Sequence, residues 1–280
     1  MLTASELKAL LTTHRLRLTQ RLGQHHLVDR SVIERLMRVL RLTREQTVVE
    51  IGAGLGALTE PLAERAGRVI GVEIDPRVCA LLRERLAARR NVTIVCGNIL
   101  TFDWAPYDGA SVVGAIPYHI TSPILLMLGE RARTIRDAWL IVQEEVAARL
   151  TARAGTKAYG RLSVLAQYHW AIATLMRIPR SAFFPQPDVD STCLHLTPRD
   201  QPRVAVANEV TFFEMVKAAF GQRRKTLVNC LIGRDRAMSR PEAEALVREA
   251  GLPVSVRGEA LSLEQFAALS NAAERLNSLR

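Results

Sequence analysis

TVVEIGAGLG, residues 47–56, joins a short apolar run to a loop that has glycine at every second position. Buried parallel strands read as continuous apolar runs, and glycine permits the positive φ angles and close ligand approach that a strand-to-helix turn needs. Glu73 ends the next apolar run, 17 residues after Gly56, about where doubly wound folds place a carboxylate on ribose hydroxyls. The alternative is that Glu73 is only a solvated strand end. The pattern favours a nucleotide-like ligand over the sheet.

Short β-rich runs alternate with helical patterns along the first part of the chain. The segments between the runs carry apolar residues at three- and four-residue spacing. Strand and helix alternating five times predict a doubly wound parallel sheet. The runs are 47–52, 68–74, 92–97, 111–117 and 137–143, and two final strands are expected within 161–179 and 191–198. The predicted fold class is therefore α/β, with a Rossmann-like seven-stranded sheet.

The last part of the chain has a different pattern. A polar segment with two prolines, residues 197–203, is typical of a linker. From about Val204 onward only helical patterning remains, and Ser239 before Pro241 has the form of a helix N-terminus. We therefore expect a larger domain over residues 1–200, which begins with a basic amphipathic helix, and a small all-helical domain over residues 201–280.

The composition favours a polyanionic partner and a cytoplasmic protein. The formal net charge is +10, and cationic side chains that neutralise phosphates release counterions, although arginine-rich proteomes also make many proteins basic. No apolar run approaches the ~18 residues of a membrane helix, and the N-terminus is too polar for a signal peptide. The four cysteines and six histidines show no metal-ligand spacing. We expect a monomer with no metal and no membrane association.

The form of the glycine loop narrows the choice of nucleotide. A dinucleotide enzyme favours G-x-G-x-x-G, and a nucleoside triphosphatase requires GxxxxGK[ST], which is absent from the sequence. The loop here is G-x-G-x-G preceded by the acidic Glu50. This combination resembles the S-adenosylmethionine loop of class I methyltransferases.

AIPYHITSPIL, residues 115–125, follows the fourth predicted strand. It resembles the (N/D)-(I/L/P)-P-Y loop of methyltransferases that modify exocyclic amines of adenine. Such an amine is a poor nucleophile, and acceptor groups that bind its protons compensate as positive charge develops. Tyr118 would stack on the base and hold it in line with the methyl group. For IPY alone, a turn with Pro117 and a packed tyrosine remains the alternative.

The resemblance extends over nearly the whole chain and identifies a family. Five further segments are similar, in order, to signatures of the small-subunit ribosomal RNA adenine dimethyltransferases. They are LGQHHLVD (22–29), KAYGRLSVL (157–165), AFFPQPDVDS (182–191), AAFGQRRKTLVNCL (218–231) and RGEALSLEQFAALSN (257–271). Macrolide-resistance methyltransferases, which modify large-subunit RNA, share the catalytic half. The QRRKTL segment and the complete helical tail favour the small-subunit branch.

The resemblance implies roles for individual residues. The cofactor-binding set comprises His25, Leu27, Gly52, Gly54, Glu73 on the ribose, Asn98 on the adenine, and Ala115. Pro117 and its neighbours would offer backbone acceptors to the target amine, with Tyr118 on one face of the flipped base and Phe183 on the other. Arg223, Arg224 and Lys225 would meet RNA phosphates, unless they form only a solvated helical face. Residues 1–200 would bind S-adenosylmethionine and residues 201–280 would bind RNA.

Three residues depart from the family pattern near the site. Ala115 stands where the family has Asn, and alanine has no side-chain oxygen to accept a proton of the target amine. Loss of one such group typically costs ~10²–10³ in rate. His26 stands where the family usually has Phe, and Asn98 replaces Asp but keeps an acceptor oxygen. Ala115 is either an engineered substitution or a natural change in a divergent paralogue, and the two further departures favour divergence.

The sequence therefore predicts methyl transfer from S-adenosylmethionine to adenine amines of small-subunit ribosomal RNA, forming dimethyladenosine, with an immature small ribosomal subunit as partner. Ala115 keeps two alternatives open. One is a catalytically impaired paralogue that acts as an RNA-binding assembly factor. The other is a methyltransferase directed at another RNA or at a small molecule.

Overall fold

The computed structural model describes residues 2–16, 25–117, 120–222, 224–232 and 238–278. By its internal contacts the chain divides into two compact units, one formed by Met1–Ala147 and Ala171–Pro198, the other by Ala148–Trp170 and Arg199–Arg280. We call them the sheet unit and the helical unit. The helical unit therefore includes a segment, 148–170, that the sequence assigns to the first domain.

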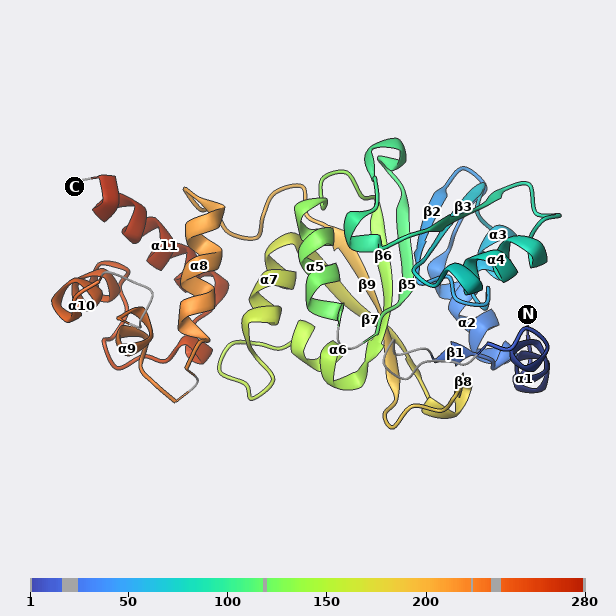
Figure 1. Ribbon diagram of the computed structural model, residues 1–280. Helices are drawn as coiled ribbons and strands as arrows, with labels where there is room; N and C mark the ends of the chain where they lie inside the picture. Colours follow the sequence, from blue (N-terminus) through green and yellow to red (C-terminus); the bar gives the residue numbers. More distant parts are fainter. Residues whose placement is uncertain (1, 17–24, 118–119, 223, 233–237, 279–280) are drawn as a thin grey trace. The chain divides into compact units, whose positions relative to one another are not determined.

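The sheet unit is built on a seven-stranded sheet with the strand order β4-β3-β2-β5-β6-β9-β7 (Figure 1). The pairs β2–β3, β3–β4, β2–β5 and β5–β6 are parallel, and β9 runs antiparallel to β6. The strands are β2 (Thr47–Ile51), β3 (Arg68–Glu73), β4 (Val92–Cys96), β5 (Ser111–Ala115), β6 (Asp137–Gln143), β7 (Trp170–Ile178) and β9 (Ser191–Pro198). This is the predicted α/β fold, and each of the five predicted parallel strands is present.

Three of the helices pack on one face of this sheet. On this face, α2 and α3 pack on side chains of β2, β3 and β5, including Val48, Val69 and Val113. On the same face, α4 packs on Ile94 of β4, which the strand register places on the side of Val48 and Val69. The helices of this part of the chain are α1 (Ala4–Thr13), α2 (Arg30–Leu40), α3 (Thr59–Ala63), α4 (Pro76–Arg85), α5 (Thr121–Glu130) and α6 (Glu144–Leu150). Single 3-10 turns lie at Ile99–Thr101, Ala105–Tyr107, Arg180–Ala182 and Gly258–Ala260.

A separate two-stranded ribbon pairs β1 (His26–Leu27) with β8 (Phe183–Phe184) in antiparallel register. His26 lies opposite Phe184, and Leu27 lies opposite Phe183. The His25 ring reinforces the pairing through Nδ1, which lies 2.7 Å from the Pro185 carbonyl oxygen, 160 residues away in sequence. The ribbon thus fixes the N-terminal segment against the loop that follows β7.

The sequence suggests a strand in the run 161–179, but the structure divides this run into a helix and a strand. Residues Arg161–His169 form the helix α7, and only Trp170–Ile178 form a strand. The Ser163 hydroxyl caps the start of α7 by accepting a hydrogen bond from the Gly160 amide and donating one to the Arg149 carbonyl. The apolar side chains of α7 that include Val164 and Tyr168 face the core of the helical unit. An apolar run of this kind suits a helix or a buried strand, so the sequence alone does not distinguish the two.

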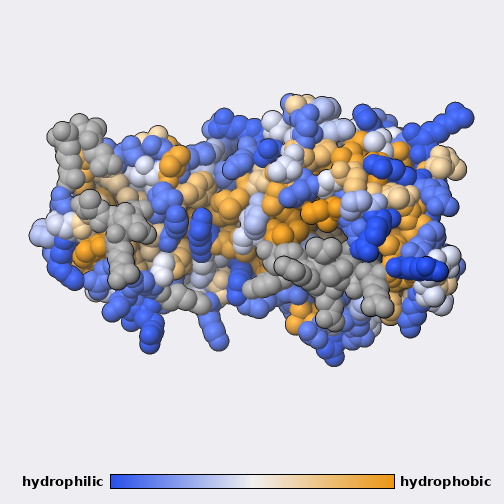
Figure 2. Space-filling view, viewed as in Figure 1, coloured by the Kyte–Doolittle hydropathy of each residue, from blue (hydrophilic) through white to orange (hydrophobic). Residues whose placement is uncertain are grey.

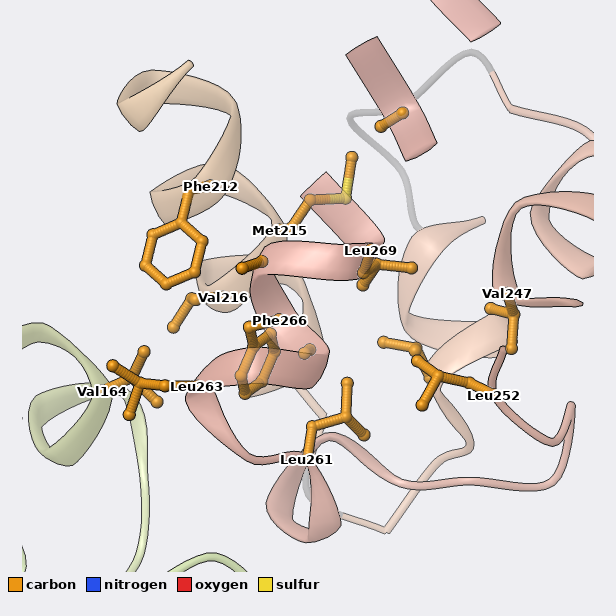
Figure 3. Packing of buried hydrophobic residues seen from close by; sticks show 14 of the residues in the cluster. Val164, Phe212, Met215, Val216, Val247, Leu252, Leu261, Leu263, Phe266 and Leu269 are labelled. Carbon is orange, nitrogen blue, oxygen red and sulfur yellow. The ribbon is translucent and has the colours of Figure 1, made fainter. Parts of the chain in front are cut away.

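The helical unit has its own hydrophobic core. Phe212 and Met215 of α8, Val247 of α10, and Phe266 of α11 are among its fully or nearly fully buried side chains (Figure 3). Its remaining helices are α8 (Glu209–Ala219), α9 (Leu227–Leu231), α10 (Arg240–Glu249) and α11 (Leu263–Ser278). Within the described parts of the chain, no helix combines the length and apolar composition required to cross a membrane.

Candidate functional site

A cavity of about 220 Å³ opens at the carboxyl ends of the parallel strands. That space is more than ten times what one water molecule requires, so it suits an organic ligand. Its wall brings together most of the residues that the sequence singles out. They are His25, Gly52, Gly54, Glu73, Asn98, Ala115 and Pro117. These residues lie far apart in sequence and meet because β2, β3, β4 and β5 end at the same edge of the sheet.

The glycine loop forms the floor of this cavity. Gly52, Gly54 and Gly56 have φ angles of +72°, +53° and +87°, which L side chains rarely adopt. A Cβ atom on Gly52 would meet no other atom within 4 Å, so the loop leaves open space above it. A Cβ atom on Gly54 would lie 2.9 Å from Cε1 of His26. Glycine at position 54 therefore lets the His26 ring approach the loop.

Glu73 is buried at the end of β3 and is held by three backbone amides. Oε2 accepts from the Gly54 amide at 2.9 Å, and Oε1 accepts from the amides of Ile74 and Asp75, each at 2.9 Å. Charge-assisted bonds of this kind fix the carboxylate plane. Because a carboxylate has about four acceptor sites and three are used here, it retains capacity for one hydroxyl donor of a ligand.

Asn98 and Ile74 provide a polar and an apolar wall. The Asn98 side-chain oxygen accepts from the Leu100 amide at 3.0 Å and caps the short turn Ile99–Thr101. Ile74 lines the cavity and is 54% exposed, although it is a large apolar side chain. Sequence reasoning missed Ile74, together with Ile99, Leu100 and Ile120. The available signal was an apolar residue directly after the acidic strand end.

The AIPY loop continues from β5. Ala115 is the last residue of that strand and contributes only a methyl group to the cavity wall. The Pro117 carbonyl accepts from the Ile120 amide at 3.2 Å and from the Thr121 hydroxyl at 3.1 Å, so its two lone pairs are used in starting α5. Among the described residues, none donates a hydrogen bond to the Ile116 carbonyl. Tyr118 lies outside the described residues.

Two predicted site residues are core residues in this structure. Leu27 is 4% exposed and Phe183 is 6% exposed, and both belong to the hydrophobic cluster that includes α2 and the sheet. Neither is part of the cavity wall. Their direct pairing in the β1–β8 ribbon explains this position, because both side chains point to the buried face of that ribbon. Contact of Phe183 with a base stays a prediction.

The predicted RNA-contacting residues lie in the helical unit, between α8 and α9. Arg224 and Lys225 are exposed there. Arg223 is outside the described part of the chain. Where the structure describes the chain, no group of three or more His, Cys, Asp or Glu side chains could hold a metal ion. Cys79, Cys193 and Cys230 are buried, whereas Cys96 is exposed.

Two titratable side chains near the glycine loop are uncharged at neutral pH. Burial raises the pKa of Glu50 to about 8, against the opposing hydrogen bond from the Thr59 hydroxyl, and the neighbouring Glu73 charge raises it further. Burial lowers the pKa of His26 to about 4, with a smaller contribution from His25. The loop therefore rests on neutral groups, and Glu73 is the charged group that it binds directly.

The seven-stranded sheet with antiparallel β9, and the glycine loop and acidic residue at its carboxyl edge, define a class I methyltransferase. Residues 15–274 match the family model for "Ribosomal RNA adenine dimethylase". The chain therefore belongs to the ribosomal RNA adenine dimethylase family.

Relatives and solved structures agree with this assignment. "Ribosomal RNA small subunit methyltransferase A" of Bacillus thuringiensis (strain Al Hakam) and that of Bacillus mycoides (strain KBAB4) are each 41% identical, over 90% of this chain and 89% of the relative. The structure of the 23S rRNA methyltransferase ErmE is 32% identical with a TM-score of 0.66, over 89% of this chain and 99% of that chain. A dimethyladenosine transferase from Plasmodium falciparum, 22% identical with a TM-score of 0.73 over 90% and 98%, shows the same fold.

Proposed function

We propose that this chain transfers methyl groups from S-adenosylmethionine to the exocyclic amine of adenine in small-subunit ribosomal RNA. One observation carries the proposal. The glycine loop, Glu73 and the AIPY loop line a single cavity in a chain that is 41% identical to a ribosomal RNA small subunit methyltransferase A. Identity to the 23S enzyme is lower, at 32%, which favours the small subunit as substrate.

The residues of the cavity fit S-adenosylmethionine. Gly52 and Gly97 leave open space where side chains would otherwise stand, and the fixed Glu73 carboxylate can accept from a ribose hydroxyl. The exposed Ile74 offers an apolar surface for a flat adenine ring, beside the Asn98 amide. When bound, the cofactor supplies an electrophilic methyl group. The protein's own part is to orient this ligand and the target base.

The target amine needs acceptors for its protons while its nitrogen becomes positively charged. Ala115 supplies none, and the Pro117 carbonyl is already engaged by two donors. The Ile116 carbonyl, a neighbour in the same loop, is the acceptor that this arrangement leaves for the amine. We therefore assign a slow methyl transfer to this chain. The position and orientation of the methyl donor and the target base provide most of its rate enhancement.

RNA binding is assigned to the helical unit. Arg224 and Lys225 are exposed there, hydrophilic side chains occupy much of its outer surface in the viewed direction (Figure 2), and the chain carries a net charge of +10. Phosphate contacts of this kind position a protein on RNA without reading its sequence. The proposed partner is an immature small ribosomal subunit, met in the cytoplasm by a monomer of this protein.

A second function is favoured by Ala115 alone. Without the side-chain oxygen that the family's Asn provides, the chain could dock on the immature small subunit and act in its assembly without efficient catalysis. Both functions require RNA binding, and they differ in methyl incorporation.

The decisive experiment incubates the protein with labelled S-adenosylmethionine and with small or large ribosomal subunits that lack the methyl groups. Three proteins are compared: the wild type, Ala115→Asn, and Ala115→Leu as a control of similar size without an acceptor oxygen. We expect slow incorporation into small-subunit adenine by the wild type. Ala115→Asn should increase the rate by ~10²–10³, and Ala115→Leu should not increase it.

The outcomes separate the candidates. Incorporation confined to large subunits would reject the small-subunit assignment. Incorporation by Ala115→Asn but none by the wild type, with salt-dependent binding of both to small subunits, would favour the assembly function. If none of the three proteins incorporates methyl groups or binds small subunits, both the methyltransferase and the assembly function are rejected.

A further inference from the structure

Helix α1 (Ala4–Thr13) precedes the region that matches the family model, which begins at residue 15. The helix begins with a capping box, in which the Thr3 side chain accepts from the Glu6 amide at 3.3 Å and the Glu6 carboxylate accepts from the Thr3 amide at 2.7 Å. A helix of ten residues is marginal by itself, even with such a cap. Its position must therefore come from packing against the rest of the sheet unit.

The first contact of α1 is with the glycine loop. Leu7 is the buried residue of the helix, only 1% exposed, and it packs in a cluster with Leu55, Val78 and Leu81. Leu55 lies between Gly54 and Gly56, and the other two belong to α4. The Leu55 carbonyl accepts from the Arg85 guanidinium, so α4 holds the backbone of the loop. The side chain of Leu55 is covered in part by α1.

The second contact of α1 is with the β1–β8 ribbon. The Lys8 ammonium lies over the Phe184 ring, 5.0 Å from its centre, and Phe184 also packs at the edge of the Leu7 cluster. Phe184 is the register partner of His26. The His26 ring in turn lies directly against Gly54. Both contacts of α1 therefore lead to the glycine loop, one through Leu55 and one through Phe184 and His26.

We propose that α1 is a positioning element of the cofactor site, and that Leu7 is its positioning residue, holding the glycine loop and His26 in the arrangement that accepts the ligand. The identity of the ligand, S-adenosylmethionine, rests on the proposed function.

Truncation of Leu7 would remove the buried side chain of α1 from the cluster that supports Leu55 and Phe184. Glycines at three alternate positions give the loop many other conformations, so fewer molecules would hold the binding arrangement. The apparent dissociation constant rises in inverse proportion to that fraction. A tenth of the molecules in the binding arrangement corresponds to a Kd about tenfold higher. Once the ligand is bound, the loop is in place, and the rate of methyl transfer at saturation should hardly change.

Coupling of this kind is reciprocal. If α1 favours the binding arrangement, then the bound ligand must favour the docked position of α1. Amide hydrogens of residues 4–13 should therefore exchange more slowly in the presence of S-adenosylmethionine, although none of these residues lines the cavity.

The test measures the Kd for S-adenosylmethionine by equilibrium dialysis on the full-length protein. Leu7→Ala should raise it about tenfold, while Leu7→Met, which conserves side-chain volume, should stay within about twofold of the wild type. Leu246→Ala is the matched control, because Leu246 is a fully buried helical leucine in the other unit. It should lower thermal stability and leave the Kd unchanged. Leu7→Val provides a milder truncation should Leu7→Ala not fold.

Each outcome decides. A wild-type Kd for the Leu7 truncations, or a fall in kcat at saturating cofactor with an unchanged Kd, would overturn the inference. An equal rise for Leu246→Ala would reduce the effect to general destabilisation and overturn it as well. Failure of the wild type to bind S-adenosylmethionine would instead reject the proposed cofactor, so the two failures are distinct.

Discussion

Replacement of Glu50 by glutamine should change how the stability of the cofactor-free protein depends on pH. The Glu50 carboxyl lies on β2 beneath the glycine loop, 2% exposed, and accepts a 2.6 Å hydrogen bond from the Thr59 hydroxyl. Burial raises its pKa from 4.5 to about 8. Between pH 4.5 and about pH 8, the folded state therefore keeps the Glu50 proton that the unfolded state releases.

The sign and size of the effect follow from that difference. A group whose pKa is higher in the folded state stabilises the fold fully below the unfolded pKa, and this contribution is lost as the pH rises through the folded pKa. For pKa values of 4.5 and about 8, the free energy of unfolding should fall by about 2.5 kcal/mol between pH 6 and pH 9 from this group. Glutamine keeps the acceptor for Thr59 and does not titrate.

The assay is urea unfolding of the wild type and Glu50→Gln at intervals from pH 6 to pH 9, followed by circular dichroism and tryptophan fluorescence. The difference between the two proteins removes the contribution of all other titrating groups. We expect the difference in unfolding free energy between the two proteins to shift by about 2.5 kcal/mol in favour of Glu50→Gln as the pH rises. Glu64→Gln, at an exposed carboxylate of the same region, should show no such shift. Parallel curves for wild type and Glu50→Gln would refute the argument.

Three further predictions concern the loop, a helix cap and the second core. Gly54→Ala should weaken S-adenosylmethionine binding at least about tenfold, because its Cβ would lie 2.9 Å from Cε1 of His26 at a φ of +53°; unchanged binding in equilibrium dialysis would exclude a role for this close approach. Asp29→Ala should cost about 1 kcal/mol of unfolding free energy, since Asp29 accepts from the Ser31 and Val32 amides in the first turn of α2 at 2.9 and 3.1 Å, and a thermal melt equal to that of the wild type would contradict this. Phe266→Ala should cost about 3–5 kcal/mol because the ring is fully buried in the helical unit; hydrogen exchange should then accelerate in α8 and α11 and not in β2 or β3.

The sheet and the cofactor floor could be predicted because their signals are local. A strand such as Thr47–Ile51 is buried on both faces, so its sequence is largely apolar and lacks the alternation of a half-exposed strand. The glycine loop and Glu73 follow from spacing, since β2 and β3 are adjacent and end at the same edge. The structure adds the protonation state of Glu50, which depends on burial that spacing does not reveal.

The remaining features depend on contacts between distant segments. The helix α7 was expected as part of a strand, because an apolar run without clear alternation suits either element until its neighbours are known. The burial of Leu27 and Phe183 follows from a ribbon that joins residues about 160 positions apart. The packing of Leu7 on Leu55 likewise has no local signal. Sequence patterns locate the reactive edge of the sheet, and long-range packing decides which side chains reach it.

The β1–β8 ribbon also sets the time at which the cavity can be completed during synthesis. The glycine loop, Glu73 and Ala115 all emerge from the ribosome well before Phe184, whose strand must pair with His26 to close one wall. A nascent chain that already contains the five parallel strands would still lack this wall. Ligand-binding competence should therefore arrive late in translation, and a growing chain would be prevented from using its cofactor before most of the sheet unit exists.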